Sequence, residues 1–376
     1  MSFRSFARSH LPFLLPVFAA QLALAAAPVR YKEASFRELI TTSDIPFGSA
    51  VDAAGITETL LLDVYQPALD TAQARPLIIF VHGGGFSIGS KTDGEIVFLC
   101  RNFAQKGYVT ASFNYRMQSP IPTYHDMALE VLRALQDGKA AVRYLRAHRK
   151  EFGIDDTKIL MGGTSAGGVL SLHYVFLDNT ELAAYADTSV SGGVEGHSGT
   201  PGVPSGINGV INCWGGVADS TILYSGNKPV ISFHGTADPT VPYDVGYSLG
   251  NPALITFGSA CVHRVLTRIG VPSILKTFPG MGHGFPSWAD DPRADTLVAM
   301  TTTFAYDVFF AGRAAVAPGS VAGADAHAPG AVRGPFLRNT LAGDQAFPSG
   351  ATRSLDGRRA SPGMQRDAIM VETLRP

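Results

Sequence analysis

Short apolar runs alternate with longer amphipathic segments between positions 57 and 277 of the chain. The run PLIIFV at 76–81 has no polar side, which is typical of a strand buried on both faces of a sheet. Such runs predict strands at positions 59–65, 76–81, 108–115, 158–161, 210–213, 229–233 and 274–278. Helices are expected at positions 96–106, 127–151, 168–176 and 294–310. Strands joined by helical crossovers predict the α/β class, with a mostly parallel central sheet and helices on both faces.

The two ends of the chain do not share this pattern. At the start, arginines precede a mostly apolar run at 11–24 and a group of small residues, as in a secretory signal peptide. We expect cleavage after Ala25, because cleavage two residues later would leave Pro28 at the new N-terminus. The alternative is a membrane anchor, but the run is shorter than the roughly 20 apolar residues of a bilayer span. We therefore expect export to the periplasm or the medium.

The last part of the chain, at 312–376, is rich in Ala, Gly, Pro and Arg and lacks sustained apolar periodicity. Such a composition predicts a low-complexity, disordered tail. The expected organisation is a signal peptide at 1–25, one folded domain at 26–311, and this tail.

Charge and cysteine content narrow the possible partners. With 30 basic and 31 acidic residues the formal net charge is −1, so no global field attracts nucleic acid or an anionic membrane. Export permits one disulfide, and the three pairings among Cys100, Cys213 and Cys261 stay open. Because no CxxC pair occurs, a structural zinc site is not expected, and we expect neither a metal nor a cofactor.

The segment GTSAG at 163–167 matches the pattern G-x-S-x-G, with Ser165 at its centre. It lies between the predicted strand at 158–161 and the predicted helix at 168–176, which is the arrangement of a nucleophile elbow. Glycines on both sides of the serine suit such a strained turn. A chance match is the alternative in a chain with 41 glycines, but the context favours Ser165 as a nucleophile.

The segment HGGGF at 82–86 directly follows the predicted strand at 76–81. Glycines let backbone N–H groups approach a carbonyl oxygen as it becomes negatively charged, so the segment predicts an oxyanion loop. We expect His82 to hold this loop by hydrogen bonding. The alternative, a phosphate-binding loop, requires a lysine placed as in a P-loop, and Lys91 is not so placed.

Asp238 lies just past the predicted strand at 229–233, where a carboxylate would orient an imidazole and stabilise its charged form. Alternatively it only opens a turn before Pro239, and Asp244 is then the nearest substitute.

His283 lies in the segment GMGHGF, after the predicted strand at 274–278, where it would take the proton of the serine and pass it to a leaving group. The rival His263 lies in an apparent helix that ends near position 268. The order Ser, Asp, His is typical of α/β-hydrolases.

With these motifs the sequence resembles the α/β-hydrolase carboxylesterases. HGGGF and GTSAGG resemble the hormone-sensitive-lipase group, whereas HGTADPTVPY and GMGHGF resemble bacterial extracellular esterases, including the bifunctional acetylxylan/feruloyl esterase type. The resemblance covers roughly positions 60–310. It implies an α/β-hydrolase fold with the catalytic domain at 26–311, and the short segment before the first predicted strand implies that there is no large cap domain.

The resemblance also implies that the backbone N–H groups of Gly84, Gly85 and Ala166 are the oxyanion donors. Thr164 stands where the lipase-like group has Asp, so the subfamily stays open. Trp214, beside two glycines at the end of a predicted strand, either lines the substrate pocket or packs in the core.

The sequence thus predicts a secreted serine carboxylesterase with a Ser165–His283–Asp238 triad and an acyl-enzyme intermediate. Short-chain or plant-cell-wall esters, as small molecules or linked to polysaccharide, are the expected substrates, with no nucleic acid partner and no stable membrane insertion after signal cleavage. The alternatives are a peptidase of the same fold, which usually carries a gating domain, and a non-catalytic binding protein, which typically lacks a triad member. The oligomeric state stays open.

Overall fold

The structure is a computed structural model, and it describes residues 29–118, 124–182, 192–224, 227–252, 254–288 and 290–311. The expected signal peptide at 1–25 and the expected tail at 312–376 lie outside the described residues.

Eight of the described strands form one large sheet in the order β1-β2-β4-β3-β5-β6-β8-β11. The pairs β1–β2 and β2–β4 are antiparallel, and the other pairs of this sheet are parallel. The mostly parallel sheet that the sequence predicts is therefore confirmed. Its strands are β1 (Leu39–Val51), β2 (Thr57–Pro67), β3 (Arg75–Val81), β4 (Val109–Phe113), β5 (Ile154–Thr164), β6 (Gly209–Cys213), β8 (Val230–Gly235) and β11 (Ser273–Phe278).

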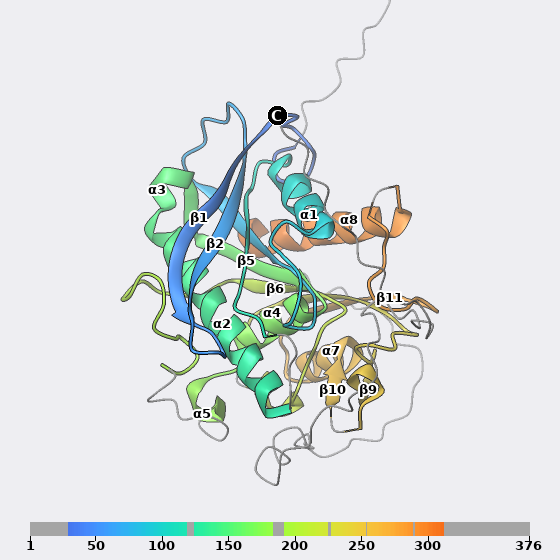
Figure 1. Cartoon of the computed structure of the whole chain (residues 1–376). Helices are drawn as coiled ribbons and strands as arrows, with labels where there is room; N and C mark the ends of the chain where they lie inside the picture. The colour runs from blue at the N-terminus through green and yellow to red at the C-terminus, as the bar shows by residue number, and fades with distance from the viewer. Residues whose placement is uncertain are drawn as a thin grey trace, which may run out of the picture.

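Helices cover both faces of this sheet (Figure 1). Alternate residues of β3 show why: Ile78 and Phe80 pack with α1 and α8, whereas Ile79 and Val81 pack with α2 and α4. Each such side chain contributes roughly 1.5–3 kcal/mol when it is fully buried. The helices are α1 (Gly94–Ala104), α2 (Tyr124–Ala147), α3 (Arg149–Phe152), α4 (Ala166–Phe176), α5 (Asn179–Leu182), α7 (Ser259–Arg268) and α8 (Pro292–Tyr306), with short helices η1 (Ser220–Tyr224), η2 (Ser248–Gly250) and η3 (Asp307–Ala311).

Strand β1 is not predicted by the apolar pattern. It pairs with β2 at one edge of the sheet, and most of its side chains are exposed, so the strand shows no apolar alternation. A small antiparallel sheet is also not predicted, since its strands are too short for a pattern: β7 (Gly216–Val217), β10 (Ile255–Gly258) and β9 (Val245–Tyr247).

Several predicted elements have other bounds in the structure, and two of them differ most. The helix expected at 127–151 starts at Tyr124 and is divided into α2 and α3, and Gly153 in a left-handed conformation ends the second one. Strand β5 begins at Ile154, which pairs with the first residue of β3, and it continues to Thr164. The turn before α4 is therefore confined to Ser165.

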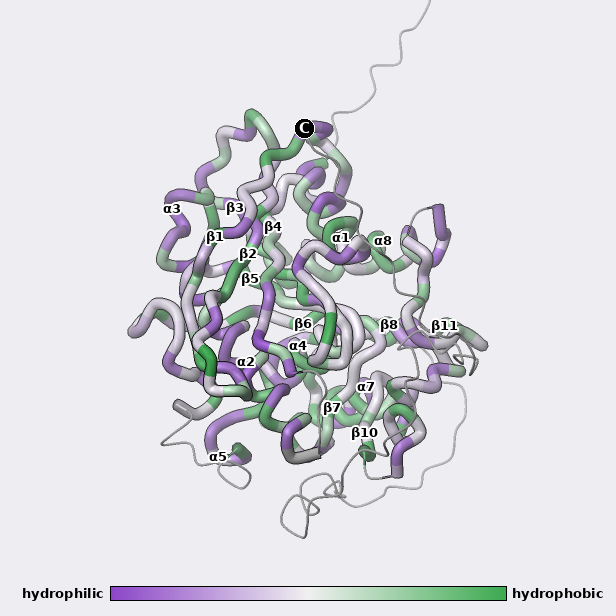
Figure 2. The backbone as a smooth tube through the Cα atoms, viewed as in Figure 1, coloured by the Kyte–Doolittle hydropathy of each residue, from purple (hydrophilic) through white to green (hydrophobic). Residues whose placement is uncertain are grey.

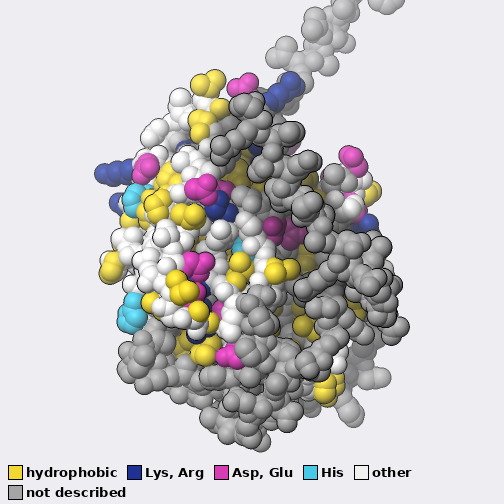
Figure 3. All heavy atoms as spheres, in the orientation of Figure 1, with side chains coloured by type: hydrophobic (Ala, Val, Ile, Leu, Met, Phe, Trp, Pro, Cys, Tyr) yellow, Lys and Arg dark blue, Asp and Glu magenta, His cyan; other side chains and the backbone are white. Residues whose placement is uncertain are grey.

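The hydropathy of the residues agrees with the arrangement of the sheet between its covering helices. In Figure 2 apolar positions concentrate in the central strands, and hydrophilic positions gather at the periphery, as in α3. On the face shown in Figure 3, acidic and basic side chains are scattered among apolar and neutral ones, in keeping with a net charge near zero.

Within the described ranges, no helix is both long and apolar enough to cross a bilayer. All three cysteines, Cys100, Cys213 and Cys261, are buried and free.

A buried ion pair ties the edge of the sheet to α2. Arg116, just after β4, contacts Asp137 of α2 at 2.8 Å, and the side chains are 8% and 0% exposed. The guanidinium also donates to the carbonyl of Val51 at the end of β1, at 2.8 Å. Arg116 thus holds three elements together at the side of the domain where the loop after β3 lies.

We expect Asp137→Ala to lower the free energy of unfolding by about 3–5 kcal/mol, because it leaves the Arg116 charge buried without its partner. Urea denaturation of the two proteins measures this difference. The matched control is Asp244→Ala, which breaks the pair of Asp244 with Arg264, both about half exposed, and should cost at most about 1 kcal/mol. Equal losses in the two variants would contradict the assignment of Arg116 as a structural anchor.

Candidate active site

The four sequence motifs lie at or just after the carboxyl ends of β3, β5, β8 and β11. In the parallel register Val81 at the end of β3 pairs with Gly163 of β5, and Gly235 of β8 pairs with Phe278 of β11. Because parallel strands have their carboxyl ends at one edge of a sheet, the loops after them meet there.

Ser165 occupies a sharp turn between β5 and α4, with a φ of 52° and a ψ of −115°. A side chain is excluded on both sides of it: a Cβ on Gly163 would lie 2.4 Å from the Val81 carbonyl oxygen, and a Cβ on Gly167 would lie 2.1 Å from it. The Ser165 N–H donates to the carbonyl of Cys213 at 2.9 Å. The turn therefore has the strand–turn–helix geometry of a nucleophile elbow.

The HGGGF segment forms a tightly held loop after β3. His82 donates through Nδ1 to the Gly83 carbonyl at 2.8 Å, and its ring stacks on Tyr115 at 4.3 Å. The Tyr115 hydroxyl in turn donates to the carbonyls of His82 and Gly83. Burial lowers the pKa of His82, in keeping with a neutral, structural imidazole. Gly84 has a φ of 100°, and a Cβ there would lie 2.0 Å from the Ile88 carbonyl oxygen.

A hydrogen-bonded path joins the three candidate catalytic side chains. Asp238 Oδ2 lies 2.7 Å from His283 Nδ1, and His283 Nε2 lies 2.8 Å from Ser165 Oγ. Because Nδ1 faces a carboxylate it carries the proton, so Nε2 accepts from the serine hydroxyl. The structure thus brings together Ser165, His283 and Asp238 in the relative order that proton transfer requires.

The two rival residues lie elsewhere. Asp244 pairs with Arg264 in an exposed ion pair, and His263 of α7 contacts the Ser273 hydroxyl at 3.0 Å. Trp214 is 1% exposed, and its ring packs against Phe285 at 5.2 Å. The geometry therefore fits the packing interpretation of Trp214 better than a place in the pocket wall.

His234 contributes to the site, although the sequence pattern did not single it out. Its Nε2 lies 3.2 Å from Asp238 Oδ2, and its Nδ1 lies 2.7 Å from the Ser259 hydroxyl. Burial alone would raise the pKa of Asp238, but hydrogen bonds from His234 and His283, together with the backbone N–H of Thr240, outweigh it and hold the pKa well below the usual range. In the sequence His234 ends a buried strand and begins the segment HGTADPTVPY, but no role was assigned to it there.

Glu95 is a second residue of the site that the sequence did not reveal. It lies in the first turn of α1, and it accepts a hydrogen bond from the hydroxyl of Thr164, the residue before the nucleophile. Burial raises the pKa of Glu95, and the bond from Thr164 and the charge of His283 oppose this rise. A glutamate in the first turn of a helix is common, so the pattern gave no reason to select it.

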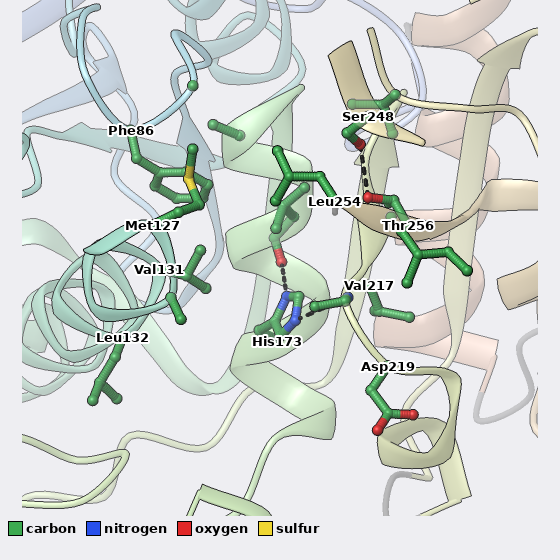
Figure 4. A pocket seen from close by; sticks show the side chains of 18 of the residues that line it. Phe86, Met127, Val131, Leu132, His173, Val217, Asp219, Ser248, Leu254 and Thr256 are labelled. Carbon is green, nitrogen blue, oxygen red and sulfur yellow. Dashed lines mark hydrogen bonds between the residues drawn. The ribbon is translucent and has the colours of Figure 1, made fainter. Parts of the chain in front are cut away.

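An apolar cavity of about 190 Å³ opens beside Ser165. Gly85, Ser165 and Ala166 lie in its wall, so two of the three expected oxyanion donors face it. Ala166 opens α4, and its N–H therefore has no partner within the helix. Figure 4 shows side chains of α2, such as Met127 and Val131, on one side of the cavity, with Leu254 on the other. In the described part of the chain, no group of three or more His, Cys, Asp or Glu residues is arranged to hold a metal ion.

The lowered pKa of Asp238 predicts a pH-dependent stability. Its carboxylate stabilises the fold above the unfolded-state pKa of about 3.9, and this contribution is lost as the pH falls toward the lower folded-state value. Wild type should therefore lose its advantage over Asp238→Asn in the free energy of unfolding below about pH 4. Urea denaturation at a series of pH values measures the free energy of unfolding of both proteins. A difference between them that stays constant as the pH falls through 4 would argue against the lowered pKa of Asp238.

A protein-family model described as BD-FAE matches residues 62–215, which include the oxyanion loop and Ser165. Probable carboxylic ester hydrolase LipM of Mycobacterium tuberculosis is 34% identical over 111 residues, or 29% of this chain and 24% of LipM. Esterase LipC of the same organism is 34% identical over 135 residues, or 35% of this chain and 31% of LipC. The matches thus span about a quarter to a third of these relatives.

Solved structures match over a larger part of the chain. Thermogutta terrifontis esterase 2 phosphorylated by paraoxon has a TM-score of 0.52 and 24% identity, over 70% of this chain and 95% of that one. The propionate-bound form has a TM-score of 0.51 and 23% identity, over 72% and 96%. The likeness to these structures shows that the chain has the α/β-hydrolase fold.

Proposed function

We propose that the chain is a serine carboxylic-ester hydrolase with Ser165, His283 and Asp238 as its catalytic triad. The observation that carries this proposal is the hydrogen-bonded path from Asp238 through His283 to Ser165, with distances of 2.7 and 2.8 Å. Ser165, at the end of this path, lies in the wall of an apolar cavity. Relatives named as carboxylic ester hydrolase and esterase support the same activity.

In the first half of the reaction, His283 Nε2 takes the proton of Ser165 as Oγ attacks the carbonyl carbon of the ester. Asp238 stabilises the positive charge that forms on the ring. The carbonyl oxygen becomes negatively charged, and the backbone N–H groups of Gly84, Gly85 and Ala166 are its proposed donors. The N-terminal end of α4 favours the same charge.

His283 then gives its proton to the leaving alcohol, and the ester C–O bond breaks to leave an acyl group on Ser165. In the second half, His283 takes a proton from water as the water oxygen attacks the acyl carbon. The proton returns to Ser165 Oγ, and the carboxylic acid leaves.

The cavity is the proposed site of the acyl group. The leaving alcohol must lie next to His283 Nε2, which protonates it. Of the described residues, Ser165 and the oxyanion loop line the cavity, whereas His283 and Asp238 do not. Structures of T. terrifontis esterase 2 have been solved with propionate and with butyrate bound, which supports short-chain esters as substrates here. Plant-cell-wall esters, free or linked to polysaccharide, belong to the same proposal.

We expect Ser165→Ala to lower kcat for p-nitrophenyl esters by roughly 10⁴–10⁶-fold, because no other group can form the acyl-enzyme. The matched control is Ser248→Ala, since Ser248 also lines the cavity but bonds only to Thr256 among the described side chains. That variant should keep most of the activity. A fluorophosphonate probe should label wild type and the control but not Ser165→Ala, and equal activity in all three proteins would refute the proposal.

We also propose that the protein is exported and that residues 1–25 are removed. The support is the basic start, the apolar run and the small residues before Ala25. Expression of the full chain in a bacterial host, followed by N-terminal sequencing of the periplasmic or secreted protein, should give a chain that begins at Ala26. An uncut chain in the membrane fraction would instead support an anchor.

A further inference from the structure

The cavity beside Ser165 extends along one face of α4. Four residues of this helix line it at intervals of three or four positions: Ala166, Val169, His173 and Leu177. The helix rises by about 4 Å from Ala166 to Val169, and by about 10 Å from Ala166 to His173. Val169 is partly exposed and lies at the first turn beyond the nucleophile, so a chain attached to Ser165 must pass it.

The volume of the cavity limits the length of such a chain. An apolar protein cavity of about 150 Å³ holds benzene, which has six carbons. On that scale this cavity, with about 190 Å³, holds about eight carbons. An extended chain advances by about 1.2 Å per bond, so eight carbons span about 8–9 Å. A chain of this length reaches from Ser165 to about His173, and it ends short of Leu177, which lies about 16 Å along the helix.

The two ionisable side chains in the wall require no polar group on a ligand (Figure 4). His173 Nδ1 donates to the Val169 carbonyl at 2.8 Å, and Nε2 faces the Ala218 N–H at 3.5 Å. Burial lowers the pKa of His173, which favours the neutral ring. Asp219 caps its own turn, because Oδ1 accepts from the Thr221 N–H at 2.8 Å. An apolar chain therefore leaves these groups with the partners that they already have.

We infer that the cavity selects straight acyl chains of about eight carbons, and that Val169 is a residue that determines this length. The inference rests on the proposed ester hydrolase function, and it extends the short-chain substrates of that proposal. Because the wall is mostly apolar, each methylene that enters should raise kcat/KM by up to about fourfold. A longer chain overfills the cavity, so further methylenes lower kcat/KM.

Two isomeric esters distinguish which half of the substrate enters the cavity. Ethyl octanoate and octyl acetate have the same atoms and nearly the same apolar surface. The leaving alcohol must lie next to His283, which does not line the cavity, so the octyl group of octyl acetate stays outside. Wild type should therefore hydrolyse ethyl octanoate with a kcat/KM about 10- to 100-fold higher, measured as acid released at constant pH. Equal values, or a higher value for octyl acetate, would overturn the inference.

The p-nitrophenyl esters of acetate, butyrate, octanoate and dodecanoate measure the length. Wild type should show its highest kcat/KM with octanoate, about 10- to 100-fold above butyrate and about tenfold above dodecanoate. A kcat/KM that stays constant from acetate to octanoate, or that still rises at dodecanoate, contradicts the inferred length. If wild type hydrolyses none of these esters faster than Ser165→Ala, the proposed function fails instead.

Val169→Phe should shorten the preferred chain. It fills the cavity with about four more carbons, so room for about four carbons of substrate remains. The highest kcat/KM should move to butyrate, and the ratio of octanoate to butyrate should fall below one. The matched control is Val175→Phe, the same change on α4 at a described residue that packs against the hydrophobic core instead of lining the cavity. The control should keep the wild-type ratio, and a wild-type ratio in Val169→Phe would overturn the inference.

Val169→Leu covers the case in which Val169→Phe does not fold, because it adds a single carbon. It should lower the ratio of octanoate to butyrate by about fourfold, the value of one buried methylene. The ratio compares two substrates of one protein, so a smaller amount of folded enzyme does not change it. A ratio that Val169→Leu leaves unchanged also overturns the inference.

Discussion

The close approach of the serine turn to the end of β3 is the constraint on which the site depends. Gly163 and Gly167 both lie against the Val81 carbonyl, so no side chain fits at either position. That contact holds Ser165 at a positive φ and starts α4 at the next residue. One backbone arrangement therefore exposes the hydroxyl, leaves the Ala166 N–H without a partner in the helix, and directs the face of α4 along the cavity.

A buried polar chain supports the other half of the site. The Asn212 amide donates to the Ser259 hydroxyl, and Ser259 contacts His234, which contacts Asp238. Asp238 also accepts from the backbone N–H groups of Thr240 and Val241. A buried carboxylate with fewer donors would tend to take up a proton. With these donors it stays charged, and it can hold the His283 ring with Nδ1 protonated and Nε2 free to accept.

The parts of this molecule that sequence predicts are those with a local physical signature. The strand at 76–81 is apolar on both faces because helices cover both, and the glycines around Ser165 reflect a steric limit. Strand β1 has no such signature, because an edge strand with exposed side chains can carry almost any polar residue. His234 lies four residues before its partner Asp238, but their contact depends on how the loop between them folds. Glu95 was missed because its partner Thr164 is distant in the sequence. The cavity was missed for the same reason, since it joins residues of the oxyanion loop, α2, α4 and the small sheet.

The polar groups around Ser165 form two sets, with hydrogen-bond donors next to its hydroxyl and acceptors farther away. Negative charge is favoured where the N-terminus of α4 meets the oxyanion loop, because backbone N–H groups point there. Away from that point the polar groups are acceptors: Asp238 behind His283, Glu95 beside Thr164, and Asp219 at the far end of the cavity. In the proposed reaction, a carbonyl that gains charge would therefore be stabilised at the N-terminus of α4 and not beside these acceptors. Under the proposed ester hydrolysis, an anionic group near Asp238 or Asp219 would meet repulsion.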